Sequence, residues 1–204
     1  MMLWQMPTLV MVLGYMLGSI PFGILLTRMG GAGDLRQIGS GNIGATNVLR
    51  TGRKGLAAAT LLLDMGKGAL AVLLGARLMG SGALDNGGAI AGTAAFIGHC
   101  FPVWLRFAGG KGVATMMGVV TALAWPVGLV FAALWLGMLG VTRISSAGGI
   151  SAALSAPVAA WYFDHIELVP PILAMALIVL WRHRANVARL IRGTEPRIGG
   201  KKGH

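Results

Sequence analysis

The residues best suited to chemistry lie together in one glycine-rich polar stretch, residues 39–50, which reads GSGNIGATNVLR. Its glycines let backbone amides approach a ligand closely, and Arg50 ends it with a permanent positive charge. Besides Arg50, four of its side chains can donate hydrogen bonds: Ser40, Asn42, Thr46 and Asn47. Glycine-rich backbone beside a cation is a common way to hold phosphate. The stretch therefore predicts an anion site, with a merely flexible loop as the alternative.

A second glycine-rich stretch, residues 99–115, carries Lys111 between two glycines. It resembles a Walker loop, but glycine stands at position 112, where Ser or Thr would hold magnesium. The first stretch contains the GxGxxG spacing of dinucleotide sites, although the βαβ unit that gives this spacing its meaning is absent. Both stretches therefore predict phosphate binding without a nucleotide motif.

Metal and nucleophile chemistry have little support in the sequence. One cysteine and four scattered histidines offer no metal-ligand spacing. There is no GxSxG nucleophile elbow, and no histidine is followed five positions later by the aspartate of soluble acyltransferase domains. His99 lies at a predicted membrane boundary, where an interfacial or hydrogen-bonded histidine is commoner than a catalytic one.

The elements that position these stretches must lie in a membrane. A chain of 204 residues, 55% hydrophobic and 11% charged, with a mean hydropathy of +0.74, is not a soluble globule. Its formal charge of +11 favours anionic lipid or anionic substrates as partners and argues against nucleic acid. The single cysteine excludes an intramolecular disulfide. The first apolar run lacks the basic start of a signal peptide, so we expect it to remain as a span.

Apolar stretches of this length predict an all-α, polytopic membrane bundle of about seven transmembrane helices, forming one domain over residues 1–204. Several helices should be short or broken, because Pro21 kinks the first and Trp125-Pro126 divides residues 113–141 into two. The predicted spans are residues 3–27, 56–79, 86–101, the two halves of 113–141, 150–163 and 168–181.

The distribution of basic residues predicts the orientation. Loops after the first, third and fifth spans and a basic tail from Arg182 to His204 hold nearly all Lys and Arg, and residues 193–204 of this tail can be partly flexible. By the positive-inside rule these loops and the C-terminus are cytoplasmic and the N-terminus is outside. A single helix over residues 113–141 would separate Arg143 from Lys111 by the membrane, so charge favours the division.

Two charged residues, Asp64 and Lys67, fall within the second predicted span at a spacing of three. Such charges are costly in a membrane unless they are paired or face a polar cavity. Two interpretations follow: a buried ion pair that fixes the rotation of the helix, or a polar cavity with Lys67 facing the anion site.

A third block, residues 182–190 with Gly193 and Glu195, completes a recognisable set. Supporting features are GSIPFG at residues 18–23, Asp64 with Lys67-Gly68, and Arg143 with Ser145-Ser146. In this order along nearly the whole chain, the blocks resemble the acyl-phosphate-dependent glycerol-3-phosphate acyltransferases of bacterial membranes, the PlsY type. One departure is Ala108, where the family often has a lysine; Lys111 remains in place.

The resemblance implies an enzyme of phospholipid synthesis. It would transfer a fatty acyl group from acyl phosphate to the 1-hydroxyl of glycerol 3-phosphate, giving lysophosphatidic acid and phosphate without metal or cofactor. It also implies a multi-pass protein of the bacterial plasma (inner) membrane, surrounded by membrane lipid and expected to be a monomer, with its active site facing the cytoplasm.

The resemblance also suggests roles for particular residues. Arg50 and Lys111 would neutralise the two phosphates, while Ser40 and Asn42 would donate to phosphate or to the developing oxyanion. The general base is either His99 or a phosphate oxygen of the bound donor. The other expected substrate-binding residues are Gly41, Gly44, Thr46, Asn47, Lys67, Gly109, Gly110, Gly112, Ser145, Ser146, His183 and Asn186, of which Ser146, His183 and Asn186 would orient glycerol 3-phosphate.

A transporter or channel for a phosphorylated metabolite is the alternative function, because basic loops and broken helices also suit transport. The collection of the polar motifs on one predicted face and the lack of an evident inverted repeat argue against it.

Overall fold

The computed structural model describes residues 4–79 and 84–199, and within them every regular element is a helix. The predicted all-α class is therefore confirmed. The chain divides into two compact units, an N-terminal unit ending at Leu123 and a C-terminal unit beginning at Ala124. That the whole chain acts as one domain stays a prediction.

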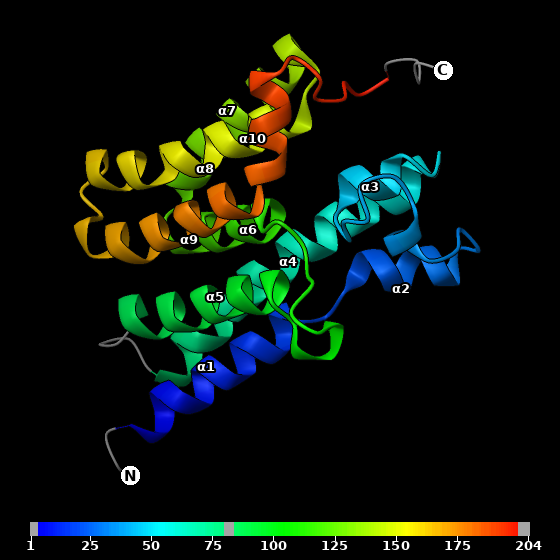
Figure 1. Ribbon diagram of the computed structural model, residues 1–204. Helices are drawn as coiled ribbons and strands as arrows, with labels where there is room; N and C mark the ends of the chain where they lie inside the picture. The colour runs from blue at the N-terminus through cyan, green and yellow to red at the C-terminus, as the bar shows by residue number, and fades with distance from the viewer. Residues whose placement is uncertain (1–3, 80–83, 200–204) are drawn as a thin grey trace. The chain divides into compact units, whose positions relative to one another are not determined.

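The N-terminal unit is built around its longest helix, α4 (Lys54–Met79), which packs against α1, α5 and α6. Figure 1 shows α1 and α5 running beside one another in this unit. Its other elements are α1 (Gln5–Gly18), α2 (Phe22–Met29), η1 (Leu35–Gln37), α3 (Ala45–Leu49), α5 (Leu84–Cys100), η3 (Val103–Leu105) and α6 (Val113–Leu123).

Glycines bring these helices into backbone contact. A Cβ atom added at Gly14 or Gly18 of α1 would lie only 2.4 or 1.9 Å from the carbonyl oxygens of Ala91 and Ala95 in α5. Since real Cβ atoms do not approach so closely, only glycine fits at these two positions. The α1–α5 contact is thus a small-residue interface of the kind that lets membrane helices pack closely.

The first predicted span is broken where Pro21 was expected to kink it: α1 ends at Gly18 and α2 begins at Phe22. The break exposes two carbonyl groups that a continuous helix would have used, and both are bound by distant side chains. The indole of Trp104 donates to the Ser19 oxygen at 2.9 Å, and Lys67 Nζ donates to the Ile20 oxygen at 2.8 Å. The prediction is confirmed, although its start at residue 3 lies outside the described residues.

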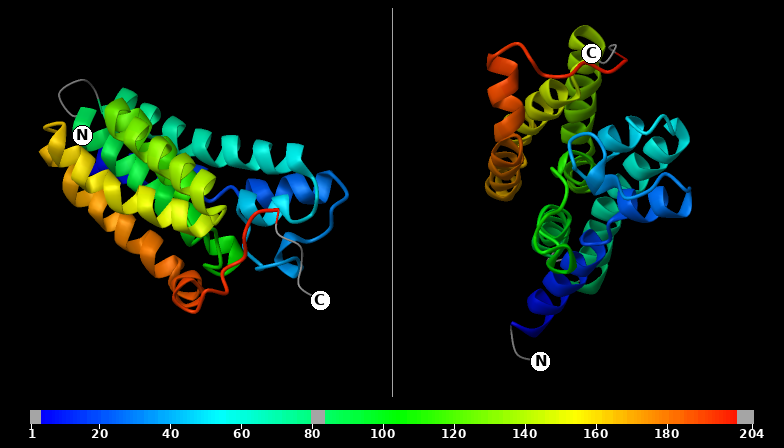
Figure 2. Two further views of the ribbon diagram at one scale, coloured as in Figure 1. Left: turned by 90° about the horizontal axis from the view of Figure 1, so that it is seen from above. Right: turned by 45° about the vertical axis from the view of Figure 1, so that its right-hand side comes forward.

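The C-terminal unit contains α7 (Trp125–Thr142), α8 (Ser145–Tyr162), η4 (Ile166–Leu168), α9 (Val169–Arg182) and α10 (Arg184–Ile191). Helix α8 packs on α7 and on α9, and Figure 2 shows α8 and α9 side by side. The separation of α6 from α7 at the extended residue Ala124 confirms the predicted division of residues 113–141.

Two predicted boundaries in this unit are wrong. Helix α8 begins five residues before the predicted start at 150, because Ser146 and Gly148 fit in its first turns: the Ser146 hydroxyl is bound by a tail residue, and Gly148 lies against the Trp135 carbonyl. The segment after residue 182 is not all tail, since α10 follows α9 at a bend of 61°. Residues 200–204 of the predicted tail lie outside the described residues.

Four helical segments in the described ranges are long and apolar enough to cross a membrane: Gln5–Met29, Lys54–Met79, Gly87–Leu105 and Trp125–Thr142. A fifth is added if the bent pair ending in α10 is counted as one span. The protein is therefore an all-helical integral membrane protein with four to five membrane helices by length and composition.

Candidate functional site

The first glycine-rich stretch is folded around one buried amide, that of Asn47, which is 2% exposed. Its Nδ2 donates to the carbonyl oxygens of Leu35 and Ile38 at 3.1 and 2.8 Å, and its Oδ1 accepts the backbone N–H of Ser40 at 3.1 Å. Because these contacts use both ends of the amide, Asn47 holds the loop in shape. Its predicted contact with substrate stays a prediction.

Side chains assigned to phosphate binding surround that amide. Arg50 donates to Asn47 Oδ1 at 3.4 Å, and the Ser40 hydroxyl lies at the same distance from this oxygen. Gly39 has φ +55°, and a Cβ there would lie 2.5 Å from Asn47 Oδ1. The structure thus brings Ser40 and Arg50 together on an exposed loop, with a glycine required between them and Asn47.

The Asn42 side chain serves the turn that follows. Its Oδ1 accepts the backbone N–H of Gly44 at 2.9 Å, immediately before the short helix α3, which contains Thr46. Gly41 has φ +68°, a conformation that favours glycine. The Asn42 oxygen therefore shapes the loop. Its amide N–H groups are the donors for its predicted hydrogen bond to phosphate or to the oxyanion.

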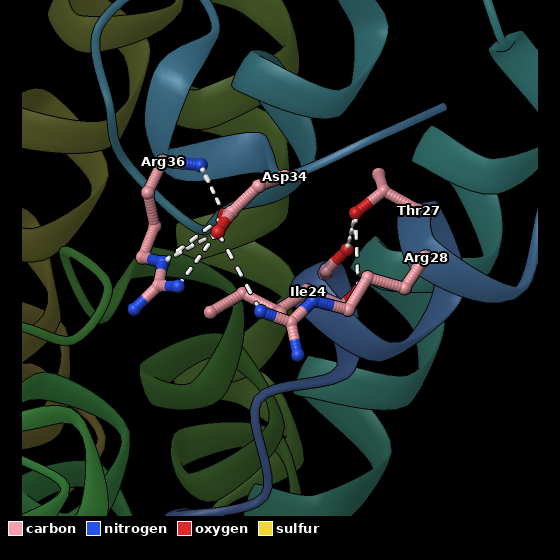
Figure 3. A network of polar contacts seen from close by, with 6 residues as sticks. Ile24, Thr27, Arg28, Asp34 and Arg36 are labelled. Atoms are coloured by element: carbon pink, nitrogen blue, oxygen red, sulfur yellow. Dashed lines mark hydrogen bonds and ion pairs between the residues drawn. The ribbon is translucent and has the colours of Figure 1, made fainter. Parts of the chain in front are cut away.

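An ion-pair cluster next to this loop was not anticipated from the sequence (Figure 3). The Asp34 carboxylate accepts hydrogen bonds from the Arg36 guanidinium, the shortest at 2.6 Å, and from the Arg36 backbone N–H at 3.0 Å. Arg28 lies 3.5 Å away from the same carboxylate. These contacts, led by the side-chain hydrogen bond from Arg36, hold the pKa of Asp34 well below its usual range. Asp34 is therefore a fixed anion that orders the loop start.

The second glycine-rich stretch begins at His99, which ends α5 and is 4% exposed. Its Nδ1 lies 3.6 Å from Asp64 Oδ1. On the other side of the ring, a Cβ atom added at Gly110 would lie 2.0 Å from Nε2, and the Gly110 N–H donates to the His99 carbonyl at 3.0 Å. The imidazole is thus enclosed between a carboxylate and the backbone of the glycine-rich turn.

Lys111 extends from this turn, directly before α6 begins at Val113. Gly109 and Gly112 flank it with backbone geometry that side chains would disturb: a Cβ at Gly109 would lie 2.2 Å from the His99 oxygen, and Gly112 has φ +89° against the Phe96 ring. The glycines therefore fix the turn that carries the lysine, and Lys111 itself is only half-buried.

Asp64 and Lys67 form a buried ion pair, each 3% exposed, with Nζ 2.7 Å from Oδ1. Lys67 also donates to the Ile20 oxygen and lies 5.6 Å from the centroid of the Phe22 ring. This geometry supports the ion-pair interpretation of the sequence. Contact between Lys67 and substrate stays a prediction.

In the C-terminal unit, residues assigned to substrate meet at a carboxylate with no predicted role, Glu195. Its side chain accepts hydrogen bonds from Ser146 Oγ at 2.7 Å, Asn186 Nδ2 at 2.5 Å and Arg189 Nε at 2.7 Å. Burial alone would raise the pKa of Glu195, but these three donors outweigh burial and lower it. A sequence signal was available, because Glu195 is the only acidic residue after Glu167.

His183 lies at the bend between α9 and α10 and is 3% exposed. Its Nδ1 is 2.8 Å from the Val179 carbonyl oxygen, which can only accept, so Nδ1 carries the proton. Ser145 begins α8 two residues after Arg143, whose φ of +60° ends α7. The Ile198 N–H donates to the Arg143 carbonyl at 2.7 Å, so the chain after α10 returns to the start of α8.

Together, these features define a class: a polytopic helical membrane protein with two glycine-rich cationic turns and a buried carboxylate that gathers polar side chains. A family model described as glycerol-3-phosphate acyltransferase matches residues 8–193. The chain belongs to the glycerol-3-phosphate acyltransferase family.

Similar proteins cover almost the whole chain. A glycerol-3-phosphate acyltransferase of Erythrobacter litoralis is 56% identical over 195 residues, 96% of each chain. One from Caulobacter vibrioides is 57% identical over 93% of this chain and 86% of the relative. A crystal structure of PlsY (YgiH), an integral membrane glycerol 3-phosphate acyltransferase in its glycerol 3-phosphate form, matches with a TM-score of 0.88 at 35% identity, over 95% of this chain and 96% of the other. The lysophosphatidic acid form of PlsY matches with a TM-score of 0.83 at 32% identity, over 94% of each chain.

Proposed function

We propose that this protein acylates glycerol 3-phosphate at its 1-hydroxyl, with acyl phosphate as the donor, and releases lysophosphatidic acid and phosphate. The observation that carries the proposal is the whole-chain likeness to the glycerol 3-phosphate and lysophosphatidic acid forms of PlsY, which name an acceptor and a product. Arg50 and Lys111 each lie in a glycine-rich turn, and two such cationic turns support a donor that carries a phosphate of its own.

In the proposed reaction the 1-hydroxyl oxygen attacks the carbonyl carbon of the acyl phosphate, and the bond from that carbon to the phosphate oxygen breaks. Arg50 and Lys111 neutralise the two phosphates, while Ser40 and the Asn42 amide donate to phosphate or to the developing oxyanion. One such donor contributes about 3 kcal/mol in other acyl-transfer sites. Positioning and charge stabilisation thus supply the acceleration.

The hydroxyl proton passes to a phosphate oxygen of the donor and leaves with inorganic phosphate. This assignment is supported by the enclosure of His99, the competing base, between Asp64 and the Gly110 backbone. Ser146, Asn186 and His183 orient glycerol 3-phosphate in this proposal, and Glu195 fixes the first two by accepting a hydrogen bond from each.

For topology, the proposal is seven crossings with the N-terminus outside, the C-terminus and active site facing the cytoplasm, and a monomer in the bacterial inner membrane, surrounded by lipid. The separate helices α6 and α7 support this count, since the predicted seven crossings include one for each half of residues 113–141. At eleven residues, α6 is about 16 Å long, roughly half of a ~30 Å hydrocarbon core, so Lys111 would lie below the headgroups.

The test is an assay of purified protein in detergent with acyl phosphate, glycerol 3-phosphate and no other additions. We expect lysophosphatidic acid and one phosphate per product, also in the presence of a chelator. Because detergent leaves no compartments, a transporter would form no product. Chelator inhibition would contradict metal-free catalysis.

The substitution Lys111→Ala sharpens this test. Removal of the compact charge at the phosphate should lower turnover by roughly 10²–10³-fold or more, as for other groups that stabilise transition-state charge. Lys54→Ala is the matched control, an exposed lysine at the start of α4 with no assigned role. Equal activity of the two variants would show that Lys111 is not part of the active site.

A further inference from the structure

A buried polar cluster in the N-terminal unit has no direct part in the proposed reaction. It consists of Asp64 and Lys67 on α4 and His99 at the end of α5, with exposures of 3, 3 and 4%. Two formal charges within an apolar helix are expensive even as a pair, and replacement of such a pair by apolar residues is often neutral for stability. Stability alone therefore gives little reason for the cluster.

The cluster connects three segments that are far apart in the sequence. Lys67 holds the α1–α2 break through the Ile20 oxygen, at 2.8 Å, and through the face of the Phe22 ring. Asp64 lies between Lys67 at 2.7 Å and His99 Nδ1 at 3.6 Å. The cluster therefore extends from the helix break to the end of α5.

The glycine-rich turn rests on the far end of this cluster. A Cβ at Gly110 would lie 2.0 Å from His99 Nε2, so backbone and imidazole are in direct contact. The N–H groups of Gly109 and Gly110 donate to the carbonyls of Cys100 and His99. The position of the His99 ring thus determines the position of the turn that carries Lys111.

The same face of α4 also fixes the other end of the turn. A Cβ added at Gly68, next to Lys67, would lie 2.4 Å from the carbonyl oxygen of Thr115 in α6, and one added at Gly118 would lie 1.9 Å from the Met65 oxygen. Helix α6 starts two residues after Lys111, so a small rotation of α4 would move both supports of the lysine.

We propose that Asp64, Lys67 and His99 are positioning residues, which set the place of Lys111 and hence of the phosphate that it binds. The inference rests on the proposed function. Neither the proton nor the substrate contacts the cluster: it acts through the Gly109–Gly110 backbone and through α6. His99 is accordingly a support of the turn and not the proton acceptor.

The test compares Asp64→Asn and Lys67→Met with Lys111→Arg, in steady-state assays with each substrate varied in turn. Lys111→Arg keeps the positive charge but changes its geometry. The substrate whose KM rises in this variant is the one that Lys111 binds. Both cluster variants should raise the KM of this same substrate by about 10–100-fold, the effect of a misplaced contact group. An unchanged KM, or a rise for the other substrate only, would overturn the proposal.

A double variant separates positioning from stability. Asp64→Asn with Lys67→Met leaves no unpaired buried charge, so its thermal midpoint should recover relative to either single variant. Its KM should nevertheless stay raised, because the connection to Ile20 and His99 is lost. Recovery of both quantities together would mean that the pair serves stability only. Thr60→Val is the control, since this buried hydroxyl on α4 bonds only to Leu56 in its own helix.

His99→Gln tests the last step. A support should retain turnover within about tenfold at saturating substrate, whereas a general base contributes roughly 10²–10⁴-fold. A loss in the larger range would overturn the positioning role of His99. If the unsubstituted protein forms no lysophosphatidic acid, the proposed function has failed; if it does so and the cluster variants behave like Thr60→Val, only the positioning proposal has failed.

Discussion

Asn47 in the N-terminal unit and Glu195 in the C-terminal unit are both buried polar side chains around which candidate site residues gather, but they do so by different chemistry. The Asn47 amide donates to two carbonyls and accepts a backbone N–H, all within residues 35–50. Glu195 only accepts, and its donors Ser146 and Asn186 come from positions 49 and 9 residues away. One centre is neutral and local, whereas the other is charged and connects distant segments.

This difference determines how each centre responds to conditions. The amide does not titrate, so the shape of the first loop should not depend on pH or salt. The carboxylate must stay ionised to accept three donors, and Arg189 beside it is 37% exposed and open to screening by salt. The N-terminal unit thus holds its candidate residues by geometry, whereas the C-terminal unit holds its own by charge.

The largest effect on this comparison is expected from Asn47→Leu. The change leaves two carbonyls and one N–H of the loop without their partner, at about 1–3 kcal/mol for each buried group, so we expect a destabilisation of at least about 3 kcal/mol. Thermal unfolding in detergent measures it, with Thr121→Val as a control that loses an exposed hydroxyl bonded within its own helix. A loss of stability that varies between pH 5 and 8 would show that the contacts of Asn47 depend on a titrating group, which contradicts this prediction.

A smaller effect is expected from Glu195→Gln. The amide can still accept from Ser146 and Asn186, but the ion pair with Arg189 is lost, which should destabilise the protein by about 1–2 kcal/mol near pH 7. Because the folded-state pKa of Glu195 is lowered, its contribution is complete above the unfolded value of about 4.3 and disappears as pH falls through the folded value. The difference in the free energy of unfolding between the unsubstituted protein and Glu195→Gln should therefore become smaller below about pH 4.3 and in high salt. A constant difference would show that the stabilisation by Glu195 does not depend on its charge.

The smallest effect should come from Arg36→Gln. This residue has the densest contacts to a carboxylate in the loop region, yet its side chain is 49% exposed, and exposed ion pairs contribute little. We expect a thermal midpoint close to that of the unsubstituted protein, in low and in high salt. A shift of the thermal midpoint as large as that of Glu195→Gln would show that solvent exposure does not determine how much the ion pairs of Asp34 and Glu195 stabilise the protein.

Local chemistry made much of this structure predictable. The break at Pro21 and the division before Trp125-Pro126 follow because proline lacks the N–H that a helix needs. The pairing of Asp64 with Lys67 follows from their spacing on a helix and the cost of lone charges in a membrane. The glycine-rich loops follow from composition alone.

Long-range contacts explain what sequence reasoning missed. Glu195 stood in a basic segment that was interpreted as tail, and nothing in its spacing pointed to Ser146, 49 residues earlier. Helix α10 was missed because its buried residue is the polar Asn186, which only the carboxylate makes tolerable inside. The contacts of Asn47 within its own loop were missed because an amide in a loop gives no sign of which way it points.

The broken first span also has a consequence for synthesis. The donors to its two exposed carbonyls lie 47 and 85 residues further along the chain, at Lys67 and Trp104. At about 5–20 residues per second, Lys67 is made roughly 2–9 seconds after Ile20, and Trp104 roughly 4–17 seconds after Ser19. Until then, the Ile20 carbonyl can accept only the nearby Phe22 N–H, at 3.1 Å, and the Ser19 carbonyl must take its hydrogen bond from water or a lipid headgroup. The first helix pair is therefore completed only after α5 has been synthesised.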